Sequence, residues 1–203
     1  YEAKRKEMNN DVDAVITTVE FANLLKEKEI DLSSLNETDF DVPLGVSTGA
    51  GAVFGNTGGV MEAALRTTYE FLENKELENI EFIDIRGLKG IKESTINIKG
   101  KEIKVAVAHT LNNAKKLLDD IKNNKCEYTF IEVMACPGGC IGGGGQPYTT
   151  NDIRQKRINS IYEIDKNSIK RKSHQNKIIQ KLYSDFLIEP LSEKSHELLH
   201  TTY

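Results

Sequence analysis

Two cysteines separated by three residues stand in the most glycine-rich part of the chain. Cys136 and Cys140 lie in the segment Met134–Pro147, which reads MACPGGCIGGGGQP. Glycines adopt backbone angles that a Cβ forbids, and they let the main chain approach a bulky ligand closely. Thiolates are soft ligands suited to iron-sulfur clusters, zinc or copper(I), and amides of a glycine-rich turn can hydrogen-bond an anionic cluster. The segment therefore predicts a metal or cluster site.

Two simpler interpretations of the same segment are weaker. One is a structural turn that holds two reduced cysteines. The other is a zinc finger, which is disfavoured because no second Cys or His pair follows at short spacing. Cys126, ten residues before Cys136, is interpreted as a packed thiol and not as a ligand.

The residues upstream predict the elements that must position the two cysteines. Tyr128–Val133 (YTFIEV) is aromatic and β-branched, so the cysteines follow the carboxyl end of a strand, where open α/β sheets bind ligands. The alternating runs Glu93–Ile98 and Glu102–Ala108 predict a hairpin, and Leu111–Asn124 predicts a helix with one apolar face. The fold class expected is α/β, with a mixed, partly parallel sheet flanked by helices and a short helical C-terminal extension.

Further elements follow from shorter patterns. Buried or alternating runs predict strands, and apolar residues at helical spacing predict helices. The predicted strands are Asp13–Thr18 and Ile80–Arg86, and the predicted helices are Glu20–Lys28, Val60–Glu73 and Ile178–Leu187.

A second glycine-rich stretch, Leu44–Arg66, reads LGVSTGAGAVFGNTGGVMEAALR. Glycines ahead of a helix place unpaired amides and the positive end of the helix dipole together, which is an anion-binding arrangement. A phosphate is the first ligand that this arrangement indicates. No Gly-Lys-Ser/Thr sequence follows, so a nucleotide-binding loop of the Walker type is disfavoured.

Composition excludes several classes of protein. The chain has 203 residues, a net charge of −4 and a pI near 5.7, which excludes nucleic-acid binding driven by bulk basic charge. No apolar run approaches the roughly 20 residues that span a bilayer, and no signal peptide is visible. Three cysteines favour a reducing compartment, so we expect a cytoplasmic protein. The basic run Asn151–Lys172 is interpreted as a solvated face, with docking of an acidic ferredoxin as the alternative.

The motif MACPGGCIGGGGQP resembles the third cysteine signature of the iron-only ([FeFe]) hydrogenases. This resemblance implies that Cys136 ligates the 4Fe-4S part of the H-cluster. It also implies that Cys140 ligates the same part and bridges through its sulfur to the di-iron part, against which Met134 lies. The stretch Leu44–Arg66 resembles the family segment that presents a phenylalanine, here Phe54, and backbone amides to the di-iron ligands. An ordinary core aromatic is the alternative for Phe54.

The two ends of the chain resemble the same family. Tyr1 and Glu2 read as the end of its second cysteine signature, so we expect the C-terminal part of a catalytic domain, with two cluster cysteines outside the chain. Residues 1–150 are expected to form the C-terminal lobe of that domain, and residues 151–203 a small-subunit-like helical segment. The segments that resemble this C-terminal part are Arg171–Asn176, Leu182–Leu187 and Ser195–Tyr203. The resemblance implies packing and capping roles, not a second metal site, for the histidines His174, His196 and His200.

The activity that the resemblance implies is reversible reduction of protons, 2H⁺ + 2e⁻ to H₂, in the protein to which this segment belongs. Its cofactor would be a 4Fe-4S cluster joined to a di-iron subcluster that carries CO, cyanide and a bridging dithiolate. Its partners would be ferredoxin or another low-potential electron carrier, the missing N-terminal part, and maturation proteins. The alternatives are an iron-sulfur assembly protein of the prelamin-A recognition factor type, a hydrogen-sensing paralogue, and an inactive fragment.

Overall fold

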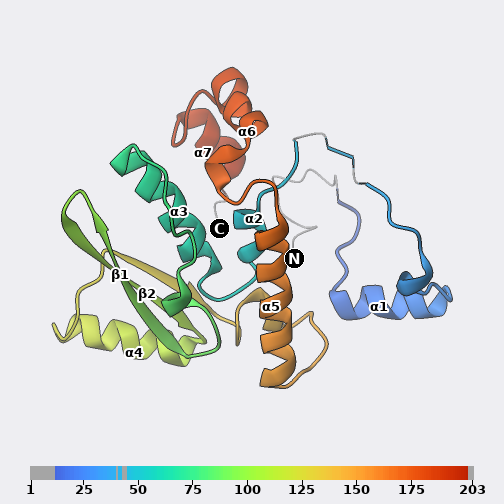
Figure 1. Cartoon of the computed structure of the whole chain (residues 1–203). Coiled ribbons are helices and arrows are strands. Elements are labelled where there is room, and N and C mark those ends of the chain that lie inside the picture. Colours follow the sequence, from blue (N-terminus) through green and yellow to red (C-terminus); the bar gives the residue numbers. More distant parts are fainter. Residues whose placement is uncertain (1–11, 40, 43–44, 201–203) are drawn as a thin grey trace. The chain divides into compact units, whose positions relative to one another are not determined.

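The computed structural model describes residues 12–39, 41–42 and 45–200 (Figure 1). Their contacts divide the chain into two compact units. The first, here called the sheet unit, consists of Val46–Gly144 and Tyr148–Asn176. The second, here called the terminal unit, holds the described residues of Tyr1–Gly45, Gly145–Pro147 and Lys177–Tyr203. The domain division expected at residue 150 stays a prediction.

A mixed three-stranded sheet forms the centre of the sheet unit. Its strands lie in the order β1 (Ile91–Ile98), β2 (Lys101–His109) and β3 (Phe130–Met134). β1 and β2 are antiparallel and form the predicted hairpin, whereas β2 and β3 are parallel. The helix α4 (Leu111–Lys122) makes the connection between the parallel strands, as a βαβ unit requires. The expected fold class is therefore confirmed.

Two helices cover opposite faces of the sheet. Alternate residues of β2 point to opposite sides, so one strand contributes to two hydrophobic clusters. On the first face the cluster includes α3 (Gly59–Glu73) and contains Met61, Leu65, Ile85, Val105 and Val107. On the second face the cluster includes α4 and contains Ala106, Ala108 and Leu117. Figure 1 shows α3 and α4 on either side of the sheet.

The sheet unit is completed by α2 (Gly49–Val53), which lies beside α5 (Asn151–Asn167) (Figure 1). The two helices approach so closely at Gly49 that a Cβ there would lie 2.1 Å from the Asp165 carboxylate. Helix α5 was not predicted, because the polar and basic run hides its few apolar positions. Only Ile158 and Asp165 of this helix are buried.

The terminal unit contains the remaining helices. These are α1 (Thr18–Glu27), α6 (Lys177–Leu182), which continues into a π-helical turn at Tyr183–Leu187, and α7 (Glu193–Leu199). Thr17 and Glu20 form a capping box at the start of α1. The helices predicted at Glu20–Lys28 and Ile178–Leu187 are thus confirmed, with boundaries shifted by at most two residues when the π-helical turn is counted with α6.

Two predicted strands are wrong. Residues 13–17 belong to no strand in the described structure, and Thr17 instead caps α1. Within Ile80–Arg86, the residues Ile83–Ile85 form a 3₁₀ helix. The alternating pattern there reflects burial of Ile85 in the cluster beneath α3, since a chain segment can bury one apolar side chain without pairing as a strand.

Among the residues that the structure describes, no helix combines the length and the hydrophobicity needed to cross a bilayer.

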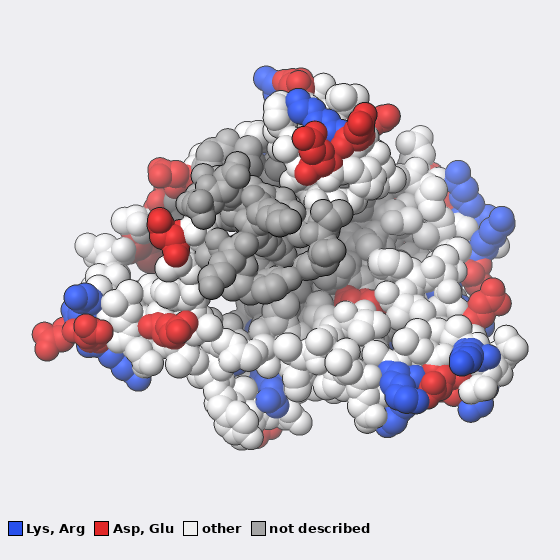
Figure 2. Space-filling model, turned by 180° about the vertical axis from the view of Figure 1, so that it is seen from behind, with Lys and Arg blue, Asp and Glu red and all other residues white. Residues whose placement is uncertain are grey.

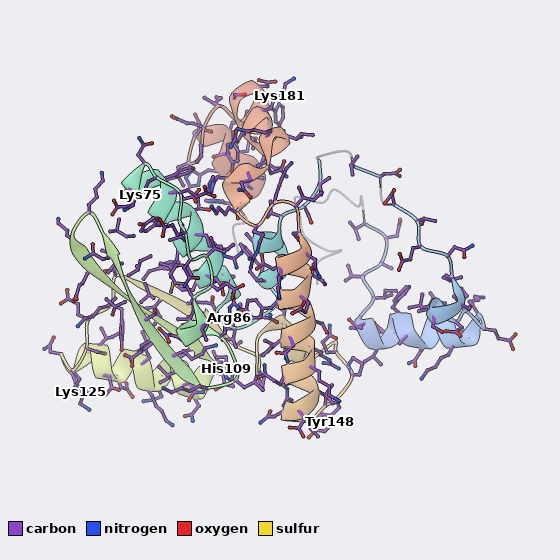
Figure 3. All side chains as sticks on the ribbon, viewed as in Figure 1. Lys75, Arg86, His109, Lys125, Tyr148 and Lys181 are labelled. Atoms are coloured by element: carbon purple, nitrogen blue, oxygen red, sulfur yellow. The ribbon has the colours of Figure 1, made fainter. Side chains whose placement is uncertain are left out.

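A buried ion network joins α3 to α5. Arg66 donates two hydrogen bonds of 2.8 Å to the Asp165 carboxylate and one of 2.7 Å to Glu62, and none of the three side chains is exposed. Arg86 and Arg171 extend the network, with bonds of 2.5 Å to Glu62 and Asp165, respectively. Figure 3 shows Arg86 where α3 and α5 come together. Burial alone would raise the pKa of Asp165, but hydrogen bonds from Arg66 and Arg171 hold it below its usual value.

We expect Asp165→Asn to destabilise the chain by about 3–5 kcal/mol at pH 7, because it leaves Arg66 buried without its counter-charge. A carboxylate with a lowered pKa stabilises the fold above its unfolded pKa, so the difference from the parent should shrink as the pH falls below about 3.9. Urea denaturation at several pH values measures both effects. Asp119→Asn, which removes an exposed pair with Lys115, is the matched control and should cost at most about 1 kcal/mol. Equal losses in the two variants would contradict the role of the buried network.

Candidate cluster-binding site

The loop that carries Cys136 and Cys140, here called the cysteine loop, follows β3 directly, at the carboxyl end of the sheet's parallel pair. Cys136 is half-buried, Cys140 is exposed, and both are free thiols. Gly138 and Gly139 between them have φ values of +81° and +97°, which L side chains rarely adopt. The glycines predicted to shape this loop therefore do so through their backbone angles.

Two backbone hydrogen bonds join the cysteine loop to the loop between α2 and α3. Thr57 N donates to Gly138 O at 2.9 Å, and Ile141 N donates to Gly55 O at 3.2 Å. A Cβ on Gly139 would lie 2.7 Å from Thr57 N, 2.8 Å from the Met134 sulfur and 2.9 Å from Gly55 O. The structure thus brings Met134 and both glycine-rich segments together.

Phe54 ends α2 and directly precedes Gly55, the residue that accepts the hydrogen bond from the cysteine loop. Its side chain is 47% exposed within the described residues. The role of Phe54 at the cluster and the alternative of an ordinary core aromatic both stay predictions.

The amino terminus of α3 is occupied by a buried carboxylate. Glu132, on β3, accepts hydrogen bonds from Gly58 N at 2.6 Å and Met61 N at 2.8 Å. The Gly58 cap has a φ of +95° and no side-chain cap of its own. The predicted anion-binding arrangement is thus present, but the anion is Glu132, so this helix end is not open to a phosphate. The amides from Phe54 to Gly59 donate to acceptors within the chain.

Lys92, on β1, bonds to the loop between α2 and α3, residues 54–58, which is here called the Phe54 loop. Its Nζ donates to Thr57 O and to Gly87 O, each at 2.9 Å, and the side chain is buried. Burial lowers the pKa of Lys92 to about 8, against a smaller raising effect of Glu132. A lysine from one edge strand and a glutamate from the other therefore hold the Phe54 loop from two sides.

His109 supports the cysteine loop from the end of β2. Its Nδ1 accepts a hydrogen bond from Gly138 N at 3.2 Å, and its Nε2 lies 3.1 Å from Leu88 O. A backbone N–H can only donate and a carbonyl only accept, so these partners select the neutral tautomer with a proton on Nε2. Figure 3 shows His109 at the end of the sheet that lies toward α5. Sequence analysis gave His109 no role, because nothing in its local pattern points to the loop.

The family of the chain follows from a comparison with protein-family models. The model described as "Iron only hydrogenase large subunit, C-terminal domain" matches residues 1–144, more than half of the chain. The chain belongs to the iron-only hydrogenase family. A second model, "Iron hydrogenase small subunit", matches residues 151–203.

Individual iron-only hydrogenases agree with this assignment. The "NADP-reducing hydrogenase subunit HndD" of Solidesulfovibrio fructosivorans is 49% identical over all of this chain, which covers 36% of that protein. The solved structure of a variant of apo [FeFe]-hydrogenase HydA1 from Chlamydomonas reinhardtii matches with a TM-score of 0.77 and 42% identity, covering all of this chain and 59% of that one. The chain thus spans about a third of the length of the HndD subunit.

Iron-sulfur assembly proteins are also related to the chain. A "Probable cytosolic Fe-S cluster assembly factor" of Drosophila melanogaster is 32% identical over 96% of this chain and 42% of that protein. The identity is lower than to the hydrogenase. The hydrogenase assignment is therefore the stronger of the two.

The thiols fit part of the ligand set that an iron-only hydrogenase cluster needs. Cys136 and Cys140 come from one glycine-shaped loop, and a Cβ on Gly143 would approach the Cys136 sulfur to 3.9 Å. The described residues contain no group of three or more His, Cys, Asp or Glu side chains placed to hold a metal ion. Cys126 precedes β3 whereas the other two follow it, so it lies at the opposite end of that strand. The roles of Cys136, Cys140, Met134 and Phe54 stay predictions.

We expect Gly139→Ala to displace the cysteine loop, since the added Cβ meets three atoms within 3 Å at a φ of +97°. Overpacking of this kind costs about 1–3 kcal/mol. Iron content after cluster reconstitution should fall well below that of the parent. Gly144→Ala is the matched control, because a Cβ there meets nothing within 4 Å. Full iron content in Gly139→Ala would contradict the importance of this close approach.

Proposed function

We propose that the chain supplies two of the four cysteine ligands of an H-cluster in an iron-only hydrogenase. The complete protein would catalyse the reversible reaction 2H⁺ + 2e⁻ to H₂. The observation that carries this proposal is the direct bonding of the cysteine loop to the Phe54 loop, with the Met134 sulfur beside both. Two thiols and the Met134 side chain are thereby brought to one end of the sheet, next to the loop that begins at Phe54.

The roles of the chain's own residues follow from this arrangement. Cys136 and Cys140 would hold the 4Fe-4S part, and Cys140, the more exposed thiol, would also bridge to the di-iron part. Met134 and Phe54 would pack against the di-iron side and limit the access of water. When bound, the cluster supplies low-potential electrons and an iron site at which protons are reduced. Protein ligation and hydrogen bonding around the thiolates tune its potential.

The proposal requires partners outside the chain. The two remaining cluster cysteines would come from an N-terminal part of the same protein, and maturation proteins would supply the di-iron part with its CO, cyanide and dithiolate. Ferredoxin or another low-potential carrier would deliver electrons. We propose a cytoplasmic location, with the hydrogenosome as the alternative. The chain alone would be inactive, because two thiolates do not complete the ligand set.

The basic run Asn151–Lys172 offers limited support for docking of an acidic carrier. Four of its seven cationic side chains bond to groups of the chain itself, namely Arg154, Arg157, Arg171 and Lys172. Three lysines remain for an acidic partner. Elsewhere on the surface, the face seen in Figure 2 carries Lys or Arg and Asp or Glu side chains in small mixed groups. We therefore favour the interpretation of a mostly structural and solvated run.

An iron-sulfur assembly protein of the prelamin-A recognition factor type is the second candidate function, and a related assembly factor supports it. Such a protein would bind a cluster through the same loop without producing hydrogen. A hydrogen-sensing paralogue is a third candidate, which would turn over H₂ poorly. The higher identity to a hydrogenase, 49% against 32% for the assembly factor, favours the hydrogenase.

The deciding experiment uses the full-length protein that contains this chain, matured with a synthetic di-iron cofactor. Hydrogen evolution with reduced viologen is measured alongside infrared spectra of the CO and cyanide region. Activity together with these bands is the expected result. Iron-sulfur absorption without activity or bands would instead support the assembly protein, and bands with very low turnover would support the sensor.

In the same protein we expect Cys140→Ser to abolish hydrogen evolution, because a serine hydroxyl does not replace a thiolate that bridges two iron sites. Cys126→Ser is the matched control and should keep activity within about twofold, since Cys126 lies at the far end of β3. Turnover by Cys140→Ser carrying a matured cluster would rule out the assigned role.

A further inference from the structure

Helix α5 carries a cationic side chain against the cysteine loop. Arg154 lies so close that its Cδ would be 3.7 Å from a Cβ on Gly138 and its Nε 3.2 Å from a Cβ on Gly142. One turn further along the helix, Arg157 donates a 2.7 Å hydrogen bond to Ile141 O. The loop that carries both thiols therefore rests on the face of α5 that these arginines share.

Arg154 differs from three other buried or partly buried arginines of the sheet unit. Arg66, Arg86 and Arg171 each pair with a carboxylate. Within the part of the chain that the structure describes, no carboxylate pairs with Arg154, whose Nη1 donates only to the neutral Asn151 amide at 2.8 Å. Its Nε is buried and has no hydrogen-bond partner among the described residues. Arg154 therefore keeps an uncompensated positive charge at the loop.

The buried, unpaired Nε of Arg154 destabilises the fold, and no structural contact of this arginine with the described residues compensates for that destabilisation. A buried donor without an acceptor destabilises the fold, and the hydrogen bond to the loop carbonyl comes from Arg157, not from Arg154. The loop would carry negative charge once its thiols are deprotonated to hold iron. A positive charge beside thiolates lowers the electrostatic free energy of the site, most of all in its more negative state.

We propose that Arg154 raises the reduction potential of the 4Fe-4S cluster held by Cys136 and Cys140, a role that rests on the function proposed above. In the step concerned, a low-potential carrier gives one electron to the oxidised cluster, which gains one unit of negative charge. Arg154 stabilises this reduced state more than the oxidised state, so reduction requires a less negative donor. The arginine touches neither substrate nor iron, and it acts through its charge on the loop.

The test is a redox titration of the full-length protein loaded with the 4Fe-4S cluster alone, followed by electron paramagnetic resonance of the reduced cluster. Arg154→Gln should shift the midpoint potential to more negative values, and Arg154→Lys, which keeps the charge, should restore most of the shift. Lys156→Gln removes the same charge from an exposed position of the same helix and should leave the potential unchanged. An unchanged potential in Arg154→Gln, or an equal shift in Lys156→Gln, would overturn the proposal.

A second variant keeps the proposal testable if Arg154→Gln fails to hold iron. Asn151→Asp is nearly isosteric and places a carboxylate at the 2.8 Å partner of Arg154 Nη1. It should neutralise the arginine and lower the potential while the arginine itself stays in place, whereas an unchanged potential would contradict the proposal. If the parent protein gives no cluster signal at all, the proposed function fails, and this outcome differs from a cluster whose potential ignores Arg154.

Discussion

Glu132 fixes the geometry on which the rest of the site depends. Its buried carboxylate sits two residues before Met134 and binds Gly58 N and Met61 N at the start of α3. One side chain thus attaches the strand that leads into the cysteine loop to the helix that follows the Phe54 loop. The positive end of the helix dipole stabilises a carboxylate there, so the attachment benefits from both hydrogen bonding and electrostatics. The backbone bonds between the two loops can then form without further adjustment.

Among the described residues, the buried charges of the sheet unit are paired between α3 and α5 but not near the cysteine loop. Where the unit needs rigidity, between α3 and α5, each buried carboxylate meets an arginine with good geometry. Near the two loops the pattern changes: Lys92, which interacts with Glu132, is buried with a pKa lowered to about 8, and Arg154 has no carboxylate partner among the described residues. An unpaired cation is costly in a low-dielectric interior. The position of Arg154 against the cysteine loop suits a site for an anionic group.

The sequence alone predicted those elements whose signal is local. The hairpin, α3, α4 and β3 each have a clear period of two or of 3.6 residues, and the cysteine loop is recognisable from its glycines. The strands expected at Asp13–Thr18 and Ile80–Arg86 failed because a strand needs a neighbour, which local alternation does not reveal. Contacts such as those of Glu132, His109 and Arg154 were missed because their partners lie far away in sequence. One signal was available, since a helix start at Gly58 without its own capping side chain implies an acceptor from elsewhere.

A cluster shared between this chain and further residues would also act as a cross-link. The two thiols of the cysteine loop cannot complete a four-cysteine ligand set by themselves. Iron binding would therefore be coupled to association with the part that holds the other ligands. The free energy of ligation would then stabilise the complete fold more than either part alone. This coupling gives a physical reason for a loop held so firmly by Glu132, Lys92 and His109: a preorganised half-site loses less entropy when the second half arrives. The same preorganisation would serve a catalyst and an assembly protein alike, because both would need the second half of the ligand set to meet a loop that is already in place.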